Sequence, residues 1–210
     1  DRAQAAVVAL PDGRILAIGG TDGAETLATT LVYDGAWSDG PPLLTARRGG
    51  AACVDGEGLV HFVGGYGEVQ RDEHEILDPE EMVWTSAAPL PQAGWELACA
   101  TDLSGAVHVL GGEGRLARHD VWDAALGQWQ QGEPMPEGRL QHDALYGPDD
   151  RLWIVGGGTR DEVRPDLLVW DGASWQQLPG PPVPVRQAGA AWLGEADAEP
   201  AVDTAAIRSL

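Results

Sequence analysis

Short apolar runs, each closed by a pair of glycines, recur along the chain. The segments RILAIGG, LVHFVGG, AVHVLGG and LWIVGG are four such runs. A second apolar run stands before each of them, as AAVVAL does, and a turn such as Pro11-Asp12-Gly13 separates the two. Short apolar runs bounded by turn residues are typical of buried strands. The pattern therefore predicts pairs of short antiparallel strands.

Two independent markers repeat with the same period. The first glycines of the doublets stand at positions 19, 64, 111 and 156, in steps of 45, 47 and 45 residues. A tryptophan follows each doublet, at positions 37, 84, 129 and 175, in steps of 47, 45 and 46 residues. A fixed period of roughly 40–50 residues indicates a repeat architecture in which each unit is one small sheet. The unit here is about 46 residues long.

Further positions follow this period and complete the unit. An aspartate ends the segment before each tryptophan, at Asp34, Asp78, Asp123 and Asp171. Seventeen residues before the doublets stand Arg2, Arg47, Gly94 and Arg139, and one further step of 47 reaches Arg186. Each unit thus reads as two strands before the doublet, a variable loop, a third strand, the aspartate turn and a fourth strand. Four antiparallel strands repeated radially predict the blades of an all-β propeller.

The order of glycine doublet, Tyr or Trp before Asp, and Trp shortly afterwards resembles the kelch repeat over roughly residues 2–193. Leu77 replaces the aromatic residue in the second unit. The dipeptides at Trp122-Asp123 and Trp170-Asp171 also suggest WD40 repeats, but no Gly-His pair precedes them. The resemblance implies a kelch-type β-propeller of four-stranded antiparallel blades, and kelch propellers usually have five to seven of them.

The predicted blades cover about residues 2–46, 47–92, 93–138 and 139–185 within a propeller domain of residues 1–193. A partial fifth unit starts at Arg186 with RQAGAAWL. Residues 194–210 then contain neither a glycine doublet nor a tryptophan. The propeller is therefore expected to be incomplete or to end in an aberrant blade.

The composition of the chain disfavours some classes of binding partner but says little about an activity. The formal net charge of −20 disfavours nucleic acid and anionic membranes as partners. The chain contains no Lys and no Asn, which we take as a sign of a GC-rich bacterial source. The chain contains no run of about 18 apolar residues, so the sequence predicts no membrane-spanning helix. The first residue is Asp1, so an upstream signal could have been removed, and a secreted or periplasmic location stays open.

The histidines and acidic residues that could bind a metal are expected to have structural or solvent-exposed roles instead. His61 and His108 stand three residues before their doublets, where a large side chain is expected to pack between blades. The run Asp72, Glu73, His74, Glu75 lies in a variable loop and is expected to be solvated. The few Tyr and His residues do not fit the copper site of radical oxidases. We therefore expect no cofactor and no metal.

Cys53 and Cys99 lie on the first strands of adjacent units, in AACV and LACA. The two positions are expected to share one register. Equivalent positions in successive blades are related by one rotation, so both thiols would point the same way. The sequence thus predicts two buried, reduced cysteines and no disulfide.

Charged residues divide between the two ends of the predicted propeller. The Arg-bearing face contains the first-strand starts and the loops after the doublets, because antiparallel strand direction brings them to one side. Ten of the thirteen arginines map there: Arg2, Arg47, Arg48, Arg71, Arg115, Arg118, Arg139, Arg160, Arg164 and Arg186. The opposite, acidic face contains the tight turns with Asp12, Asp55, Glu57, Asp102 and Asp149 among others.

Three functions fit this layout, and a non-catalytic binding module fits best. A protein or small anionic ligand would bind around the channel mouth, through Arg2, Arg47, Arg48, Arg115, Arg118, Arg139, Arg160, Arg186 and His142. Hydrogen bonding between blades is the competing role for the arginines in phase with the repeat. The resemblance also allows a bacterial sugar epimerase or lyase-like enzyme, with His142 and Asp143 as candidate residues. A purely structural module is the third possibility.

Overall fold

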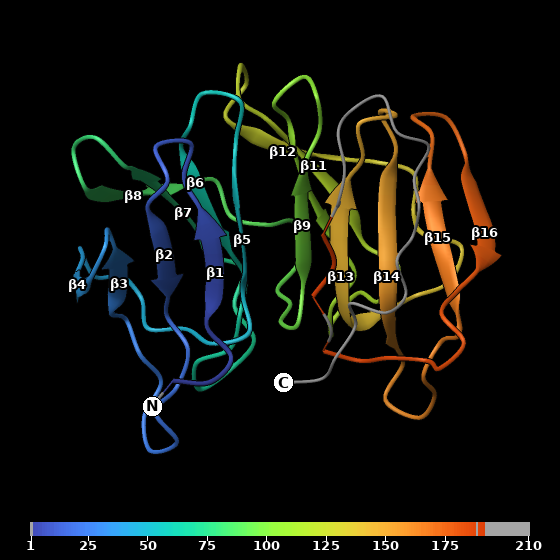
Figure 1. Ribbon diagram of the computed structural model, residues 1–210, viewed down its shortest axis with the longest axis horizontal. Helices are drawn as coiled ribbons and strands as arrows, with labels where there is room; N and C mark the ends of the chain where they lie inside the picture. Colours follow the sequence, from blue (N-terminus) through green and yellow to red (C-terminus); the bar gives the residue numbers. More distant parts are fainter. Residues whose placement is uncertain (1, 188, 192–210) are drawn as a thin grey trace.

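The computed structural model describes residues 2–187 and 189–191, and all regular structure in this part of the chain is β (Figure 1). Sixteen strands form four antiparallel sheets, each in consecutive order. The first sheet contains β1 (Ala6–Ala9), β2 (Ile15–Ile18), β3 (Thr30–Tyr33) and β4 (Trp37–Asp39). The second contains β5 (Ala51–Val54), β6 (Val60–Val63), β7 (His74–Asp78) and β8 (Val83–Ala87).

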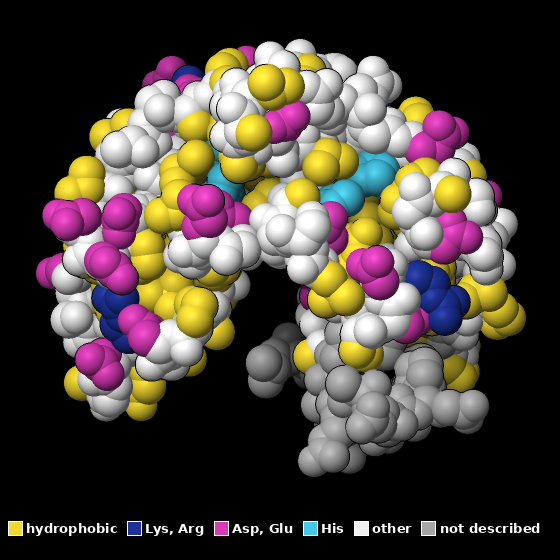
Figure 2. Space-filling view, turned by 90° about the horizontal axis from the view of Figure 1, so that it is seen from above, with side chains coloured by type: hydrophobic (Ala, Val, Ile, Leu, Met, Phe, Trp, Pro, Cys, Tyr) yellow, Lys and Arg dark blue, Asp and Glu magenta, His cyan; other side chains and the backbone are white. Residues whose placement is uncertain are grey.

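The third sheet contains β9 (Ala98–Thr101), β10 (Val107–Leu110), β11 (His119–Asp123) and β12 (Gln128–Gln131). The fourth contains β13 (Leu140–Tyr146), β14 (Leu152–Gly158), β15 (Asp166–Trp170) and β16 (Trp175–Pro179). The innermost strands β1, β5, β9 and β13 contact one another in succession around a common axis. The described part of the chain thus forms the four complete blades of a β-propeller that the repeat predicts, and the space-filling view shows an arc of blades (Figure 2).

The glycine doublets let neighbouring blades approach closely. Gly19 has a φ of 61°, and a Cβ there would collide with the carbonyl of Arg47. The second glycine donates its N–H to the start of the next blade, from Gly20 to Arg47 O at 2.8 Å and from Gly112 to Arg139 O at 2.8 Å. A side chain at the first position would force these backbones apart, so glycine is required there. In the fourth blade, β14 continues through the doublet instead of ending before it.

The periodic tryptophans attach each blade to the one before it. Each indole Nε1 donates to a carbonyl four residues after the tryptophan of the preceding blade, from Trp84 to Pro41 at 3.1 Å, from Trp129 to Ala88 at 3.0 Å and from Trp175 to Glu133 at 3.0 Å. The hydrophobic core accordingly lies between blades: Leu16, Phe62 and Trp84 pack together between the first two. This explains why the tryptophan and the doublet keep one period.

The backbone repeat continues into the predicted fifth unit. Residues with a positive φ recur in phase at the start of each unit: Gln4, Gly49, Glu96, Gln141 and Gln187. The Gln187 N–H donates to Gln141 O at 2.9 Å, as the Gly49 N–H does to Gln4 O. The fifth unit thus begins with the same local geometry as the others. The predicted divergent segment 194–210 lies outside the described residues.

The prediction of two free cysteines was wrong, because Cys53 and Cys99 form a disulfide with Cα atoms 6.1 Å apart. The error is one of register. Cys53 pairs with His61, three residues before its doublet, whereas Cys99 pairs with Val109, only two residues before its doublet. Successive residues of a strand point to opposite faces of the sheet, so this offset turns the two side chains toward each other. The bond therefore joins the second and third blades near the axis.

The disulfide gives the first testable prediction. Its loop spans 46 residues, and closing a loop of that length in the unfolded chain stabilises a protein by about 4 kcal/mol in the chain-entropy model. Replacing both cysteines by serine should lower the free energy of unfolding by that order, measured by urea titration. Thiol titration of the denatured, unreduced protein should find no free thiol. Two reactive thiols per chain would contradict the assignment.

Candidate functional site

The first-strand starts and the tight turns lie at opposite ends of the propeller, as the strand directions predict. The first strands begin at the Arg-bearing face, at the bottom of Figure 1, and the tight turns lie at the top. The view from the turn side shows many acidic side chains and few basic ones (Figure 2). Candidate binding residues must therefore be judged by whether they reach the surface of the Arg-bearing face.

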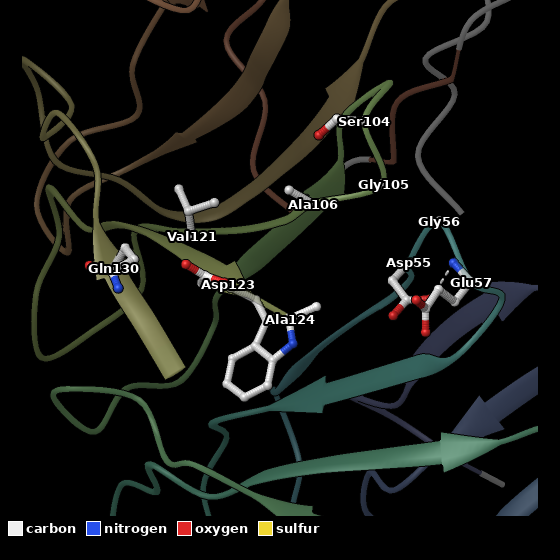
Figure 3. A pocket seen from close by; sticks show the side chains of 11 residues that line it. Asp55, Gly56, Glu57, Ser104, Gly105, Ala106, Val121, Asp123, Ala124 and Gln130 are labelled. Carbon is white, nitrogen blue, oxygen red and sulfur yellow. Dashed lines mark hydrogen bonds between the residues drawn. The ribbon is translucent and has the colours of Figure 1, made fainter. Parts of the chain in front are cut away.

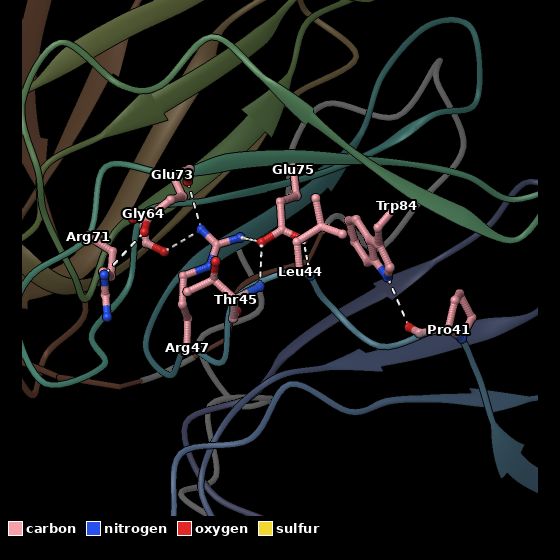
Figure 4. Close-up of polar contacts among 9 residues, drawn as sticks. All are labelled: Pro41, Leu44, Thr45, Arg47, Gly64, Arg71, Glu73, Glu75 and Trp84. Carbon is pink, nitrogen blue, oxygen red and sulfur yellow. Dashed lines mark hydrogen bonds and ion pairs between the residues drawn. The ribbon is translucent and has the colours of Figure 1, made fainter.

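Three of the predicted binding residues, Arg47, Arg118 and Arg139, are fully buried. Arg47 donates to Glu73 O at 2.7 Å and to Glu75 Oε1 at 2.8 Å, and these contacts are drawn in Figure 4. Burial lowers the pKa of the Arg47 guanidinium, and the neighbouring Glu75 carboxylate opposes this shift. These bonds hold the loop between the second and third strands of the same blade. The burial favours a structural role for the in-phase Arg47 and Arg139, but their side chains bind within a blade and not between blades as the sequence suggested.

Arg139 repeats this arrangement in the fourth blade, whereas Arg118 of the third blade lies in the loop before β11 and donates back toward the start of the blade. Arg139 donates to Asp166 O at 2.8 Å and forms an ion pair with the Asp166 carboxylate. Arg118 donates to Gln92 O at 2.7 Å and lies 3.5 Å from Asp120, which Arg115 also contacts at 3.1 Å. Burial lowers the pKa of both buried guanidinium groups. Arg115 is therefore tied to the same carboxylate as a buried arginine.

The remaining predicted arginines are partly or fully exposed. Arg2 donates to Thr29 O at 2.9 Å and to Thr29 Oγ1 at 2.7 Å, and Arg186 donates to Thr159 O. Arg160 is the most exposed, with 71% of its side chain accessible, and forms an ion pair with Glu113. Arg2, Arg160 and Arg186 therefore already have acceptors.

Arg48 differs from every other described arginine. Its guanidinium lies 5.3 Å from the centre of the Tyr66 ring, and the contacts of the described residues include no carboxylate partner for it. The Tyr66 ring lies 5.2 Å from that of Trp95, and all three side chains are partly exposed. Backbone bonds from Arg48 N to Tyr66 O at 3.0 Å and from Glu113 N to Trp95 O at 2.8 Å fix this end of the strands. We call Arg48, Tyr66 and Trp95 the mouth cluster.

Sequence reasoning found Arg48 but missed its two aromatic neighbours. Tyr66 directly follows a glycine doublet, and Trp95 directly follows Gly94, which replaces the in-phase arginine. Both positions lie outside the repeat pattern that explains the periodic tryptophans. An aromatic residue outside the repeat, at the end of a strand on the Arg-bearing face, was the available signal.

His142 and Asp143, the candidates for an enzyme, point to opposite faces of β13. The His142 side chain is 8% exposed and packs against Gly111 and Gly157. Burial lowers its pKa to about 3, and Arg139 adds to the shift. Asp143 accepts the Ala190 N–H at 2.6 Å, and burial raises the pKa of its carboxyl group. This placement provides no shared acid and base for a substrate at the mouth.

The histidines in phase with the repeat are buried, as the sequence predicts. His61 and His108 each lie 2.9 Å from a second buried histidine, His74 and His119 respectively. The expectation that the run from Asp72 to Glu75 is solvated was wrong for its last two residues. The third strand begins at His74, so His74 and Glu75 lie inside the blade.

A cleft of about 500 Å³ opens on the acidic face between the second and third blades. Figure 3 shows Asp55 and Glu57 on one side, and Ser104, Asp123 and Gln130 on the other. The two turns meet where Gly56 N donates to Gly105 O at 3.1 Å. The sequence did not reveal this cleft, because it depends on the spacing between blades.

No family model matches the chain, and no curated protein matches it. The described residues contain no group of three or more His, Cys, Asp or Glu side chains placed to hold a metal ion. They also contain no helix of the length and apolarity needed to cross a membrane.

Adjacent arginines in the second blade provide a matched test of these assignments. Arg47→Ala should lower the free energy of unfolding by about 3–5 kcal/mol, because it leaves the Glu75 carboxylate buried without its cation. Arg48→Ala removes only a partly exposed cation–π contact and should cost less than about 1 kcal/mol. Urea unfolding of both variants measures this difference. Equal losses would show that the burial of Arg47 has been misassigned.

Proposed function

We propose that this chain is a non-catalytic, kelch-type binding module that recognises a carboxylate-bearing ligand at the mouth cluster. The ligand is a small anionic molecule or an acidic segment of a protein partner. The fold supports this proposal, since propellers present loops from several blades around one channel mouth. The kelch assignment rests on the glycine doublets, the aspartate turns and the tryptophans that keep one period.

The observation that carries the proposal is the state of Arg48. Among the described arginines, nine form ion pairs with carboxylates, and Arg2 and Arg186 donate to backbone carbonyls. Arg48 has only the Tyr66 ring beside it. A guanidinium without an anion partner is suited to bind a ligand carboxylate through two parallel hydrogen bonds.

Aromatic and polar neighbours add selectivity to this charge. Tyr66 and Trp95 offer apolar surface next to the guanidinium, so a ligand with an aromatic or apolar group beside its carboxylate gains contacts with both. Glu96 accepts a hydrogen bond from Gln141 at 2.9 Å, and Glu113 holds Arg160 across the next two blades. The two carboxylates nearest Trp95 along the backbone thus already have partners of their own.

The large negative charge of the protein is compatible with an anionic ligand. The net charge is −20, and the acidic residues of the tight turns lie at the opposite end of the strands. At physiological ionic strength, charges more than about 8 Å apart are largely screened. A carboxylate at the mouth therefore responds mainly to Arg48 and its immediate surroundings.

Benzoate, phenylacetate and succinate are suitable probes for binding of a small anionic molecule. An acidic peptide containing Phe or Tyr tests binding of an acidic protein segment. Calorimetric titration should show saturable binding, with the aromatic acids tighter than succinate. Arg48→Ala should weaken that binding roughly tenfold to a hundredfold, the value of a charged hydrogen-bonded contact. Trp95→Ala should reduce the preference for aromatic acids.

Arg14→Ala is the matched control, because Arg14 pairs with Asp12 at the acidic face. It should leave affinity unchanged. Binding that survives Arg48→Ala, or the absence of saturable binding to every probe, would contradict the proposal. The melting temperature of each variant, measured on the same samples, separates lost contacts from lost folding.

A further inference from the structure

Two buried hydrogen-bonded lines of Asp, His and His run through the second and third blades. In the second blade, Asp55 Oδ2 lies 3.0 Å from His61 Nε2, His61 Nδ1 lies 2.9 Å from His74 Nε2, and His74 Nδ1 lies 3.2 Å from Ala88 O. In the third blade, Asp102, His108, His119 and Glu133 O form the same sequence of contacts at 3.2, 2.9 and 2.9 Å. We call these the two Asp–His–His lines.

Both lines lie where adjacent blades meet. His74 packs edge-on against Trp122 of the third blade, with ring centres 4.6 Å apart, and His119 lies 5.7 Å from Trp170 of the fourth. The first blade has Leu16 and Thr30 in the two histidine positions, and the fourth has Trp153 and Leu167. The lines thus lie where the second blade meets the third and where the third meets the fourth.

Counting protons along each line reveals its charge. Its two ends are acceptors, because a backbone carbonyl cannot donate and an ionised carboxylate only accepts. Three contacts between acceptors and ring nitrogens therefore need three protons. Two neutral imidazoles carry only two N–H protons. Without a third proton, one of the three contacts therefore joins two acceptors and has no hydrogen between them. Such an unsatisfied buried contact is costly.

We infer that each Asp–His–His line holds one additional, shared proton, so that the imidazole pair carries a positive charge balanced by the aspartate. Each line is then a neutral unit with all three hydrogen bonds formed. The two units make the packing of the second blade on the third, and of the third on the fourth, sensitive to pH. The proton belongs to the line as a whole and not to one residue.

The surroundings favour one shared proton and oppose a second. Burial lowers the pKa of His61 and of His108 overall, and the hydrogen bonds to Asp55 and Asp102 oppose this shift. Losing the shared proton would leave two acceptor nitrogens facing each other, and the cost of that contact favours the protonated line in the same way as the hydrogen bonds to aspartate do. Burial and the partner histidine lower the pKa of His74 to about 3 and that of His119 to about 4, so neither line accepts two protons near neutrality.

Few other charged groups face the lines in the described part of the chain. Arg47 lies behind His74 and lowers its pKa further. The Trp122, Trp129, Trp170 and Trp175 rings are uncharged, and so is the Tyr146 phenol beside His108, whose pKa is raised to about 12. Cys53, opposite His61, is in the disulfide. The lines therefore titrate without competition from neighbours between about pH 6 and 9.

The shared protons predict a maximum of stability near neutral pH. In the unfolded chain, each pair of histidines binds about one proton in total at pH 6.5, the same number as the folded line. Below that pH the unfolded chain binds more protons, so stability falls as pH falls. Above it the folded line binds more, so stability falls as pH rises toward the pKa of the line. Lines without a shared proton would give only the acidic decline.

The test is the melting temperature of the full chain from pH 5 to 9, compared with the Asp55→Asn/Asp102→Asn variant. The asparagine amide donates to the histidine without an added proton, and its oxygen still accepts the Glu57, Leu59, Ser104 and Ala106 N–H groups. The wild-type protein should melt highest near pH 6.5 and several degrees lower at pH 9. The variant should show no loss between pH 7 and 9.

A wild-type melting temperature that is constant or rising from pH 6.5 to 9 would overturn the inference, and so would an equal alkaline loss in the variant. If the variant does not fold, nitrogen NMR of the wild-type histidine rings decides the matter. At pH 7, each line should show one imidazole pair with three protonated ring nitrogens. Two neutral tautomers in each line would refute the shared proton.

Discussion

Each blade depends on the close approach of its neighbour's backbone, which the glycine doublets permit. The second glycine of a doublet donates to the carbonyl at the start of the next blade, at 2.8 Å in the first three blades. Since any side chain at the first glycine would strike that carbonyl, the contact fixes both residue type and spacing. The tryptophans, the buried arginines and the apolar strands then fill the space that this contact defines.

The architecture could be predicted from the sequence because it repeats. A single doublet or tryptophan is ambiguous, but two markers with one period specify a radial stack of small sheets. The cysteines show the limit of this reasoning. Cys53 and Cys99 are 46 residues apart, yet their doublets are 47 apart, and that one residue reverses the face of one strand. Period alone therefore predicts the fold but not the direction of each side chain.

The candidate site was predictable only in outline. Strand direction placed the arginines at one end of the propeller, but side-chain burial then divided them. Arg47 and Arg48 are adjacent in sequence, and one is fully buried on Glu75 while the other lies on an aromatic ring at the mouth. Tyr66, Trp95 and the second histidine of each line depend on contacts between strands and blades. Such contacts leave little signal in a single sequence.

The central claim is that burial, ion pairs and existing hydrogen bonds occupy the other described arginines and leave Arg48 available to an anion. Arginine modification by phenylglyoxal, followed over time by mass spectrometry of the native protein, tests this claim residue by residue. Arg48 and the exposed Arg160 should react early, Arg47 and Arg139 only after unfolding, and benzoate should slow the modification of Arg48 alone. Modification of Arg47 as fast as that of Arg48, or no protection of Arg48 by benzoate, would contradict the account.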